Sequence, residues 1–264
     1  MDFKFKENYD FYDLVNIMQI LRQPGGCPWD AEQTHKSIRR DFLEETYEAI
    51  EAIDTDNTEL LCEELGDVLL QVVFHSQIEA EKEDGFNIDQ VCDGICKKLI
   101  IRHPHVFGDV IAETPDKVLE NWDAIKMQTK DQSTYAEMLD SVSHALPSLM
   151  RAHKVQKKAA KLGFDWDDVS GAMQKLSEET EELSEAISKG DADSCYEELG
   201  DVLFSAVNVS RFIGVDPEQS LSSSVDKFIS RFKVVEELAV ERGLDMKTAT
   251  LEELDALWDV AKKM

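Results

Sequence analysis

Apolar residues recur at intervals of three and four positions along most of the chain, which is the spacing of one face of an α-helix. The pattern covers residues 10–22, 38–53, 58–82, 88–101 and 115–127, then 148–161, 170–188, 192–213, 217–241 and 250–263. Glycine and proline interrupt it, for example at Pro24-Gly25-Gly26 and Gly163. No stretch alternates apolar and polar residues as a strand does. The pattern predicts an all-α protein built from antiparallel helical bundles.

The second half of the chain repeats the first. Residues Glu45, Glu48, Glu64 and Asp67 recur 134 positions later (179 − 45 = 134) as Glu179, Glu182, Glu198 and Asp201. Other shared features are Gly26–Asp30 with Gly163–Asp167, Lys98-x-x-x-Arg102 with Lys227-x-x-x-Arg231, and Trp122 with Trp258. Repetition in one order predicts two tandem homologous domains. We expect these at residues 1–130 and 148–264, with a polar linker at 131–147.

The charge composition limits the kinds of molecule that the protein can bind. Lys and Arg number 28 against 55 Asp and Glu, so the net charge is −27. Such a chain repels nucleic acid and anionic membranes, and we expect it to bind neither. No apolar run reaches 18 residues, and the start lacks the apolar core of a signal peptide. We therefore expect a cytoplasmic protein whose five cysteines are reduced thiols.

Two helical segments carry acids on a stripe that is otherwise surrounded by apolar residues. In the first segment, 64–75, the stripe contains Glu64, Asp67, Gln71 and His75. In the second segment, 198–209, it contains Glu198, Asp201, Ser205 and Asn208. The simplest alternative is a solvated acidic face, but a helix that is apolar on its other sides is buried on most of them.

Carboxylates that crowd together in a partly buried place must be protonated, paired with a base or bound to cations. No Lys or Arg lies on either stripe. Hard divalent cations suit an all-oxygen ligand set, so we expect Mg²⁺, with Mn²⁺ as a substitute. An oxygen-activating di-metal bundle is disfavoured because the pairs here lack the Glu-x-x-His motif of ferritin-like proteins.

The spacing of these acids is similar to that of a known protein family. Each half contains EExxE, at 44–48 and 178–182, then a spacer of 15 residues and ExxD. With GCPWD at 26–30 and RHPHVF at 102–107, the chain resembles the all-α nucleoside triphosphate pyrophosphohydrolases, and within them the MazG family, over residues 10–262. The resemblance implies Mg²⁺-dependent hydrolysis of nucleoside triphosphates to the monophosphate and pyrophosphate. It also implies a homodimer, because bundles in this family are completed between chains.

Roles for individual residues follow from the acids and from the resemblance together. We expect the metal ligands to be Glu179, Glu182, Glu198 and Asp201 in the second copy and Glu45, Glu48, Glu64 and Asp67 in the first. Glu178, adjacent to Glu179, is expected to assist as a general base or a supporting partner, with Glu44 as its counterpart. The resemblance favours the second copy as the main catalyst. The first copy would then be a weaker site, a regulatory nucleotide site or an assembly domain.

The expected substrate contacts are basic and aromatic. Lys227 and Arg231, like Lys98 and Arg102, lie one helical turn apart, as required to hold neighbouring phosphate oxygens, although a surface ion pair is an equal alternative. The resemblance favours phosphate binding, and it makes Trp258 and Trp122 candidates for stacking on the base, against the alternative of core packing. Lys175, one turn before Glu179, is a further candidate for phosphate contact.

Two rival interpretations remain. A non-catalytic acidic helical adaptor or nucleotide-sensing protein would use its acids to dock basic partners, but buried acids give such a protein no advantage. A zinc site could be drawn from Cys92, Cys96, His103 and His105, although reduced core thiols and a capping loop fit those residues better.

Overall fold

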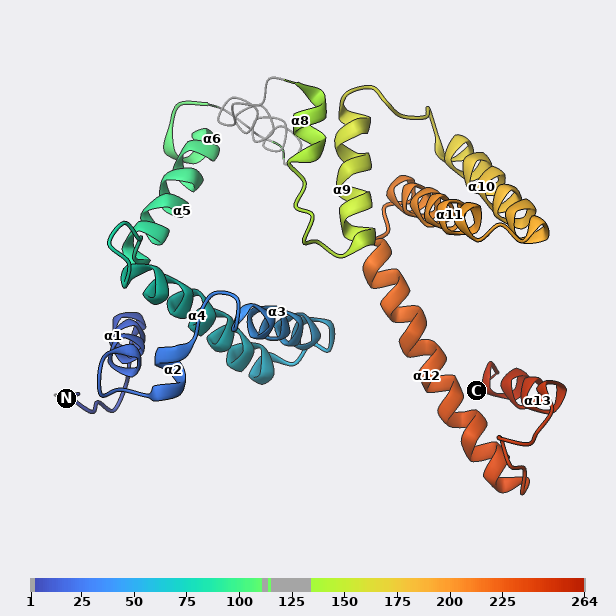
Figure 1. The fold of residues 1–264 in the computed structure, drawn as a ribbon, viewed down its shortest axis with the longest axis horizontal. Coiled ribbons are helices and arrows are strands. Elements are labelled where there is room, and N and C mark those ends of the chain that lie inside the picture. Colours follow the sequence, from blue (N-terminus) through green and yellow to red (C-terminus); the bar gives the residue numbers. More distant parts are fainter. Residues whose placement is uncertain (1–2, 111–113, 115–133, 264) are drawn as a thin grey trace. The chain divides into compact units, whose positions relative to one another are not determined.

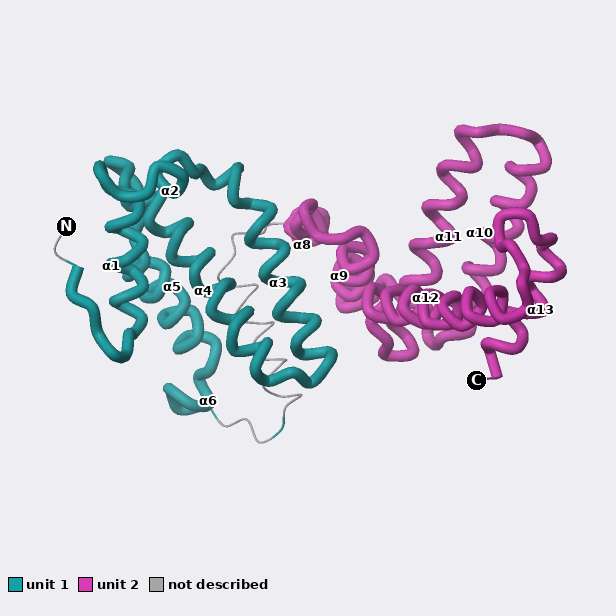
Figure 2. The backbone as a smooth tube through the Cα atoms, turned by 90° about the horizontal axis from the view of Figure 1, so that it is seen from below, with its two compact units in different colours: residues 1–130 teal, residues 131–264 magenta. Residues whose placement is uncertain are grey.

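The computed structural model describes residues 3–110, 114 and 134–263, and every regular element in these ranges is a helix (Figure 1). The predicted all-α fold is confirmed. The chain divides into two compact units, residues 1–130 and 131–264 (Figure 2). The helix expected at 115–127 lies outside the described residues.

The first unit is organised around its longest helix. The elements are α1 (Phe11–Arg22), α2 (Pro28–Glu32), α3 (Arg39–Asp54), α4 (Thr58–Ala80), α5 (Ile88–Arg102) and α6 (Pro104–Phe107). Helices α1, α3 and α5 all pack against α4, and α3 and α4 form an antiparallel hairpin. The core contains Met18 of α1, Ile38 before α3, and Val73, Phe74 and Ile78 of α4. The three core residues of α4 lie on its C-terminal half, so its N-terminal half is left to pair with α3.

A buried arginine fixes the loop that contains the GCPWD string. The Nε and Nη2 atoms of Arg22 donate to the two carboxylate oxygens of Glu81, each at 2.8 Å. Its Nη1 donates to the backbone carbonyl of Asp30 and, at 3.1 Å, to that of Gln33. The Arg22 side chain is only 4% exposed. One guanidinium therefore joins the end of α1, the α2 loop and the end of α4.

We expect Arg22→Met to lower the free energy of unfolding of the first unit by about 2–3 kcal/mol. The substitution keeps the apolar contacts of the side chain but leaves two partly buried carbonyls and the Glu81 carboxylate without their donor. Chemical denaturation monitored by circular dichroism measures the change. Arg40→Met is the matched control, because Arg40 makes an exposed pair with Glu44 and its loss costs well under about 1 kcal/mol.

The second unit contains α8 (Tyr135–Asp140), α9 (Ser148–Lys161), α10 (Val169–Lys189), α11 (Ala192–Phe212), α12 (Pro217–Glu241) and α13 (Leu251–Ala261). Helices α10 and α11 form a hairpin, and α9 packs on both α11 and α12. Helix α13 returns along the distal part of α12 and buries Leu257 and Ala261 against Val235 and Ala239. Helix α8 lies within the stretch expected to be a linker, and it packs on α9.

The two hairpins turn in the same way. A residue just past the first helix has a positive φ in each copy, 52° at Asp56 and 69° at Gly190, and these positions are 134 apart (190 − 56 = 134). The next residue, Asn57 or Asp191, caps the following helix with its side chain. A left-handed residue followed by a side-chain cap reverses the chain tightly. The repeat therefore extends to the turns that set the register of α3 with α4 and of α10 with α11.

Candidate functional site

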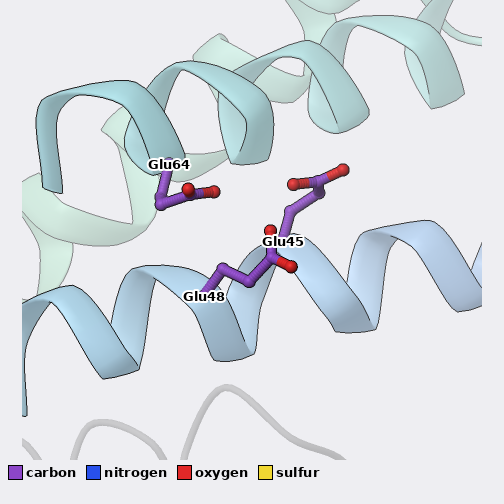
Figure 3. A group of neighbouring side chains, drawn as sticks. All are labelled: Glu45, Glu48 and Glu64. Atoms are coloured by element: carbon purple, nitrogen blue, oxygen red, sulfur yellow. The ribbon is translucent and has the colours of Figure 1, made fainter. Parts of the chain in front are cut away.

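Three glutamates converge between the helices of the first hairpin (Figure 3). Glu45 and Glu48 lie one turn apart on α3, and Glu64 reaches them from α4. One carboxylate oxygen from each lies within 4.8 Å of the others. Glu64 is 8% exposed, Glu45 is half-buried and Glu48 is exposed. We call Glu45, Glu48 and Glu64 the first triad.

The equivalent residues converge in the second hairpin. Glu179 and Glu182 of α10 and Glu198 of α11 also offer oxygens within 4.8 Å of one another, and Glu179 is 5% exposed. We call these three residues the second triad. The fourth predicted ligand of each copy, Asp67 or Asp201, is not part of its triad; Asp67 is half-buried and Asp201 is exposed. The structure thus brings together three of the four acids in each copy.

The carboxylates of the first triad repel one another. Burial raises the pKa of Glu45, and the charges of Asp67, Glu48 and Glu64 raise it further. Burial also raises the pKa of Glu64, together with the charges of Glu48 and Asp67. In the second triad, burial raises the pKa of Glu182, with added effects of Glu179 and Glu198. Raised pKa values indicate charge that the protein itself leaves uncompensated.

In the second hairpin a lysine pairs with the acids, and the first hairpin has no basic residue at that position. The Nζ atom of Lys175 lies 2.5 Å from Oε1 of Glu179 and 2.8 Å from Oε1 of Glu178. These two hydrogen bonds raise the pKa of Lys175. The matching residue of the first hairpin is Asp41 (175 − 134 = 41), whose charge contributes to the raised pKa of Glu45. Lys175, expected on phosphate, is bound to carboxylates in this structure.

Each triad has the dimensions of a site for a small hard cation. Mg²⁺ binds oxygens at about 2.0–2.1 Å in an octahedron, so its ligand oxygens lie up to about 4.2 Å apart. Oxygens within 4.8 Å of one another reach that arrangement by small side-chain rotations. Three protein ligands leave the remaining positions to water or phosphate. The residues therefore fit Mg²⁺ or Mn²⁺.

A small groove beside the second triad was not foreseen. It has a volume of about 160 Å³ and is lined by Glu182, Glu185, Ala186, Lys189, Asp191, Ser194 and Glu198. Lys189 therefore supplies a positive charge at the edge of the candidate site, where it pairs with Glu185 at 3.1 Å. The repeat does not mark Lys189, because the first copy has Thr55 at the equivalent position. The only signal in the sequence is that Lys189 lies in the last turn of α10.

Apart from Lys175, the predicted substrate contacts of the second copy lie on other helices than the second triad. Lys227 and Arg231 are on α12, and Trp258 on α13 packs its ring on Phe228 with centroids 5.1 Å apart. Trp258 also packs at the edge of the α12–α13 core. Among the described residues, no hydrogen bond or ion pair joins Lys227 or Arg231 to the second triad. One chain therefore does not bring these groups onto its own carboxylates.

The corresponding residues of the first copy are only partly described. Lys98 and Arg102 lie on α5, where Lys98 is exposed and Arg102 is half-buried. Trp122 lies outside the described residues. Cys92 and Cys96 are exposed, and all five cysteines are free thiols. In the described ranges, the two triads are the only groups of three or more potential metal-binding side chains, so the zinc alternative gains no support.

The polar stripe of α4 continues beyond the first triad into a histidine pair. The Nδ1 atoms of His35 and His75 lie 2.7 Å apart, and Nε2 of His35 lies 2.6 Å from Oε1 of Glu79. Burial lowers the pKa of His75, and the neighbouring His35 lowers it further. The pair needs one ring to accept a hydrogen bond, so it requires at least one neutral histidine.

We expect acidification to destabilise the first unit through His75. The folded protein has a lower pKa at His75 than the unfolded chain, whose value is about 6.5. The unfolded state therefore takes up the proton first, and stability falls as the pH drops below about 6.5. The free energy of unfolding, measured between about pH 7.5 and 5.5, should fall less steeply with decreasing pH in His75→Gln than in the unmodified protein. An unchanged slope in the variant would contradict the assignment.

The helices of the described residues include none with the length and apolar character needed to cross a membrane.

Comparison with known proteins assigns the family. The MazG nucleotide pyrophosphohydrolase domain matches twice, at residues 33–107 and 168–235. The nucleoside triphosphate pyrophosphohydrolase/pyrophosphatase MazG of Thermotoga maritima is 45% identical over 96% of this chain and 95% of its own. The nucleoside triphosphate pyrophosphohydrolase of Escherichia coli K12 is 41% identical over 95% of this chain and 96% of its own. An uncharacterized Bacillus subtilis protein, YabN, is 47% identical over 97% of this chain and 52% of its own. The chain belongs to the MazG nucleotide pyrophosphohydrolase family and contains the family domain in two copies.

Proposed function

We propose that the protein hydrolyses nucleoside triphosphates to the monophosphate and pyrophosphate with Mg²⁺, by attack of water on the α-phosphorus, and so clears unwanted nucleotides from the pool. The observation that carries this proposal is the carboxylate triad present at equivalent positions of both hairpins. Family membership supports it, since two relatives aligned over most of their length are named for triphosphate pyrophosphohydrolysis. Mn²⁺ is expected to replace Mg²⁺.

The triad residues would hold the metal. In the second copy these are Glu179, Glu182 and Glu198, and Asp201 on the same face of α11 would join through a side-chain rotation or a water molecule. When bound, the cation neutralises phosphate charge and acidifies a coordinated water. Without such neutralisation, a triphosphate would be repelled by the carboxylates. The negative charge of the carboxylates is therefore the reason why the site would need a divalent cation to bind a triphosphate.

The remaining side chains would handle the proton and the phosphates. Glu178 is exposed and adjacent to Glu179, so it can accept the proton of the attacking water once Lys175 has left it. Lys227 and Arg231 would bind phosphate oxygens, and Trp258 would contact the base. We propose the second copy as the main catalyst, because its triad has two lysines beside it, Lys175 and Lys189.

The protein is proposed to act as a homodimer. Helix α12 exposes an apolar row of Leu221, Val225, Phe228, Ile229 and Phe232, each at least 44% exposed. The hairpin helix α11 exposes Leu199, Leu203 and Phe204 in the same unit. Exposed apolar surface of this extent is typical of protein interfaces. A partner chain that packs on α12 would also allow Lys227 and Arg231 of one chain to reach the carboxylates of the other.

Hydrolysis in ¹⁸O-labelled water tests the proposed reaction. Pure protein is incubated with each nucleoside triphosphate and Mg²⁺, and the products are identified by mass spectrometry. We expect pyrophosphate without label and a monophosphate containing one ¹⁸O atom, as attack at the α-phosphorus requires. Orthophosphate with a diphosphate would contradict the site of attack. Absence of turnover with every nucleotide would favour the adaptor.

A further inference from the structure

The two copies differ in charge at one position that touches the metal-binding acids. Lys175 of the second copy binds Glu179, a member of the second triad, and Glu178. Asp41, the equivalent residue, adds a negative charge near the first triad. The members of the first triad make no ion pair within the described ranges, and the nearby Arg40 pairs with Glu44 instead. The same helical position therefore supplies opposite charges to two otherwise matching ligand sets.

The position of Lys175 makes it a competitor for the metal. Its ammonium group lies 2.5 Å from Oε1 of Glu179, which is the most buried carboxylate of the second triad. A metal ion bound at that oxygen would lie within a few ångströms of the ammonium group, and two cations this close repel each other. Metal binding at the second triad therefore works against the Lys175–Glu179 ion pair, whereas metal binding at the first triad only relieves repulsion.

We propose that Lys175 closes the second triad to divalent cations until it is displaced, whereas the first triad, beside Asp41, binds them without nucleotide. This inference rests on the proposed function, because it takes the triads as metal sites. It predicts two classes of metal site in one chain, a tight class at Glu45, Glu48 and Glu64 and a weaker class at Glu179, Glu182 and Glu198. The displaced ammonium is then available to an arriving triphosphate, so metal and substrate enter the second site together.

Titration of the nucleotide-free, full-length protein with Mn²⁺, followed by electron paramagnetic resonance of the free ion, measures both classes. A background variant, Glu45→Gln with Glu64→Gln, removes the first triad and leaves the second. In that background we expect Lys175→Met to lower the Mn²⁺ dissociation constant about tenfold or more. Lys175→Gln is a second variant of the same test. Lys262→Met is the matched control, because it breaks a Lys–Asp pair on α13 with Asp259.

The reciprocal exchange tests the first copy. With Glu179→Gln and Glu198→Gln in place, Asp41→Lys should weaken Mn²⁺ binding at the first triad about tenfold. Dissociation constants that stay within about twofold in the Lys175 variants, or that shift equally in Lys262→Met, would overturn the inference while leaving the metal sites intact. Absence of any bound Mn²⁺ in the unmodified protein would instead contradict the proposed function, and the inference with it. Circular dichroism verifies that each variant is folded.

Discussion

Glu179→Gln is expected to lower the turnover of nucleoside triphosphates by at least about 100-fold. The substitution keeps the size of the side chain but removes the negative charge of the most buried member of the second triad. It also removes the Lys175 ion pair, although Lys175 retains Glu178 as a partner. Steady-state assays of pyrophosphate release measure the effect. Since Glu179 is proposed as a ligand of the cation, the loss should appear in kcat and should persist at high Mg²⁺.

Two control variants show whether the loss of turnover is specific to the second triad or follows from the loss of any carboxylate. Glu181→Gln removes an exposed acid from the same helix, outside the triad and its groove, and should leave turnover nearly unchanged. Glu45→Gln removes the equivalent ligand of the first copy and should have a smaller effect than Glu179→Gln. Equal losses from Glu45→Gln and Glu179→Gln would show that the two copies contribute equally and would contradict the ranking proposed for them.

The double variant Lys227→Ala with Arg231→Ala is expected to raise KM about 100-fold, since two charge-assisted contacts to phosphate are lost. Both residues are on α12, whereas the triad of the same chain is on α10 and α11. Lys233→Ala, an exposed lysine on the same helix, is the matched control and should leave KM unchanged. A KM that rises equally in the control would indicate a general effect of charge and contradict a specific contact.

Mixed dimers reveal which chain supplies the basic residues. Chains with Glu179→Gln are combined with chains that carry Lys227→Ala and Arg231→Ala, after denaturation and refolding together. If the site is shared between chains, half of the dimers contain one intact site of two, and about a quarter of the normal activity returns. If each chain builds its own site, the mixture, assayed at a substrate concentration well below the raised KM, shows only the residual activity of the two variants. Light scattering of the unmodified protein first establishes whether it is a dimer.

Much of the architecture follows from local sequence patterns. The spacing of apolar residues at three and four positions predicts the helices, because this spacing follows from the geometry of a single helix. The same geometry predicts that Glu45 and Glu48 lie side by side, and the repeat predicts that α10 and α11 copy this arrangement. These features require no knowledge of how distant segments meet. Glu64 is buried as expected, but the expectation that its helix is buried on most sides is wrong for a single chain, because Leu65 and Leu69 are 54% and 39% exposed.

Features that depend on distant or alternative partners were not predictable. Arg22 and Glu81 are 59 positions apart, and nothing in their local sequence pairs them. Lys175 can reach either a phosphate or Glu179 from the same helical position, so spacing alone does not decide between them. The exposure of Asp201 depends on how α9 and α12 cover α11. Helix α8 forms in a polar segment through a capping box at Thr134 and its packing on α9.

The central claim is that divalent cations bind among the glutamates of each hairpin. Crystals soaked in a high concentration of Mn²⁺ and measured near the manganese absorption edge test it most directly. We predict one or more anomalous peaks within coordination distance, about 2.2 Å, of carboxylate oxygens in both triads. Anomalous maps without a peak beside either triad, from crystals that diffract well, would contradict the claim.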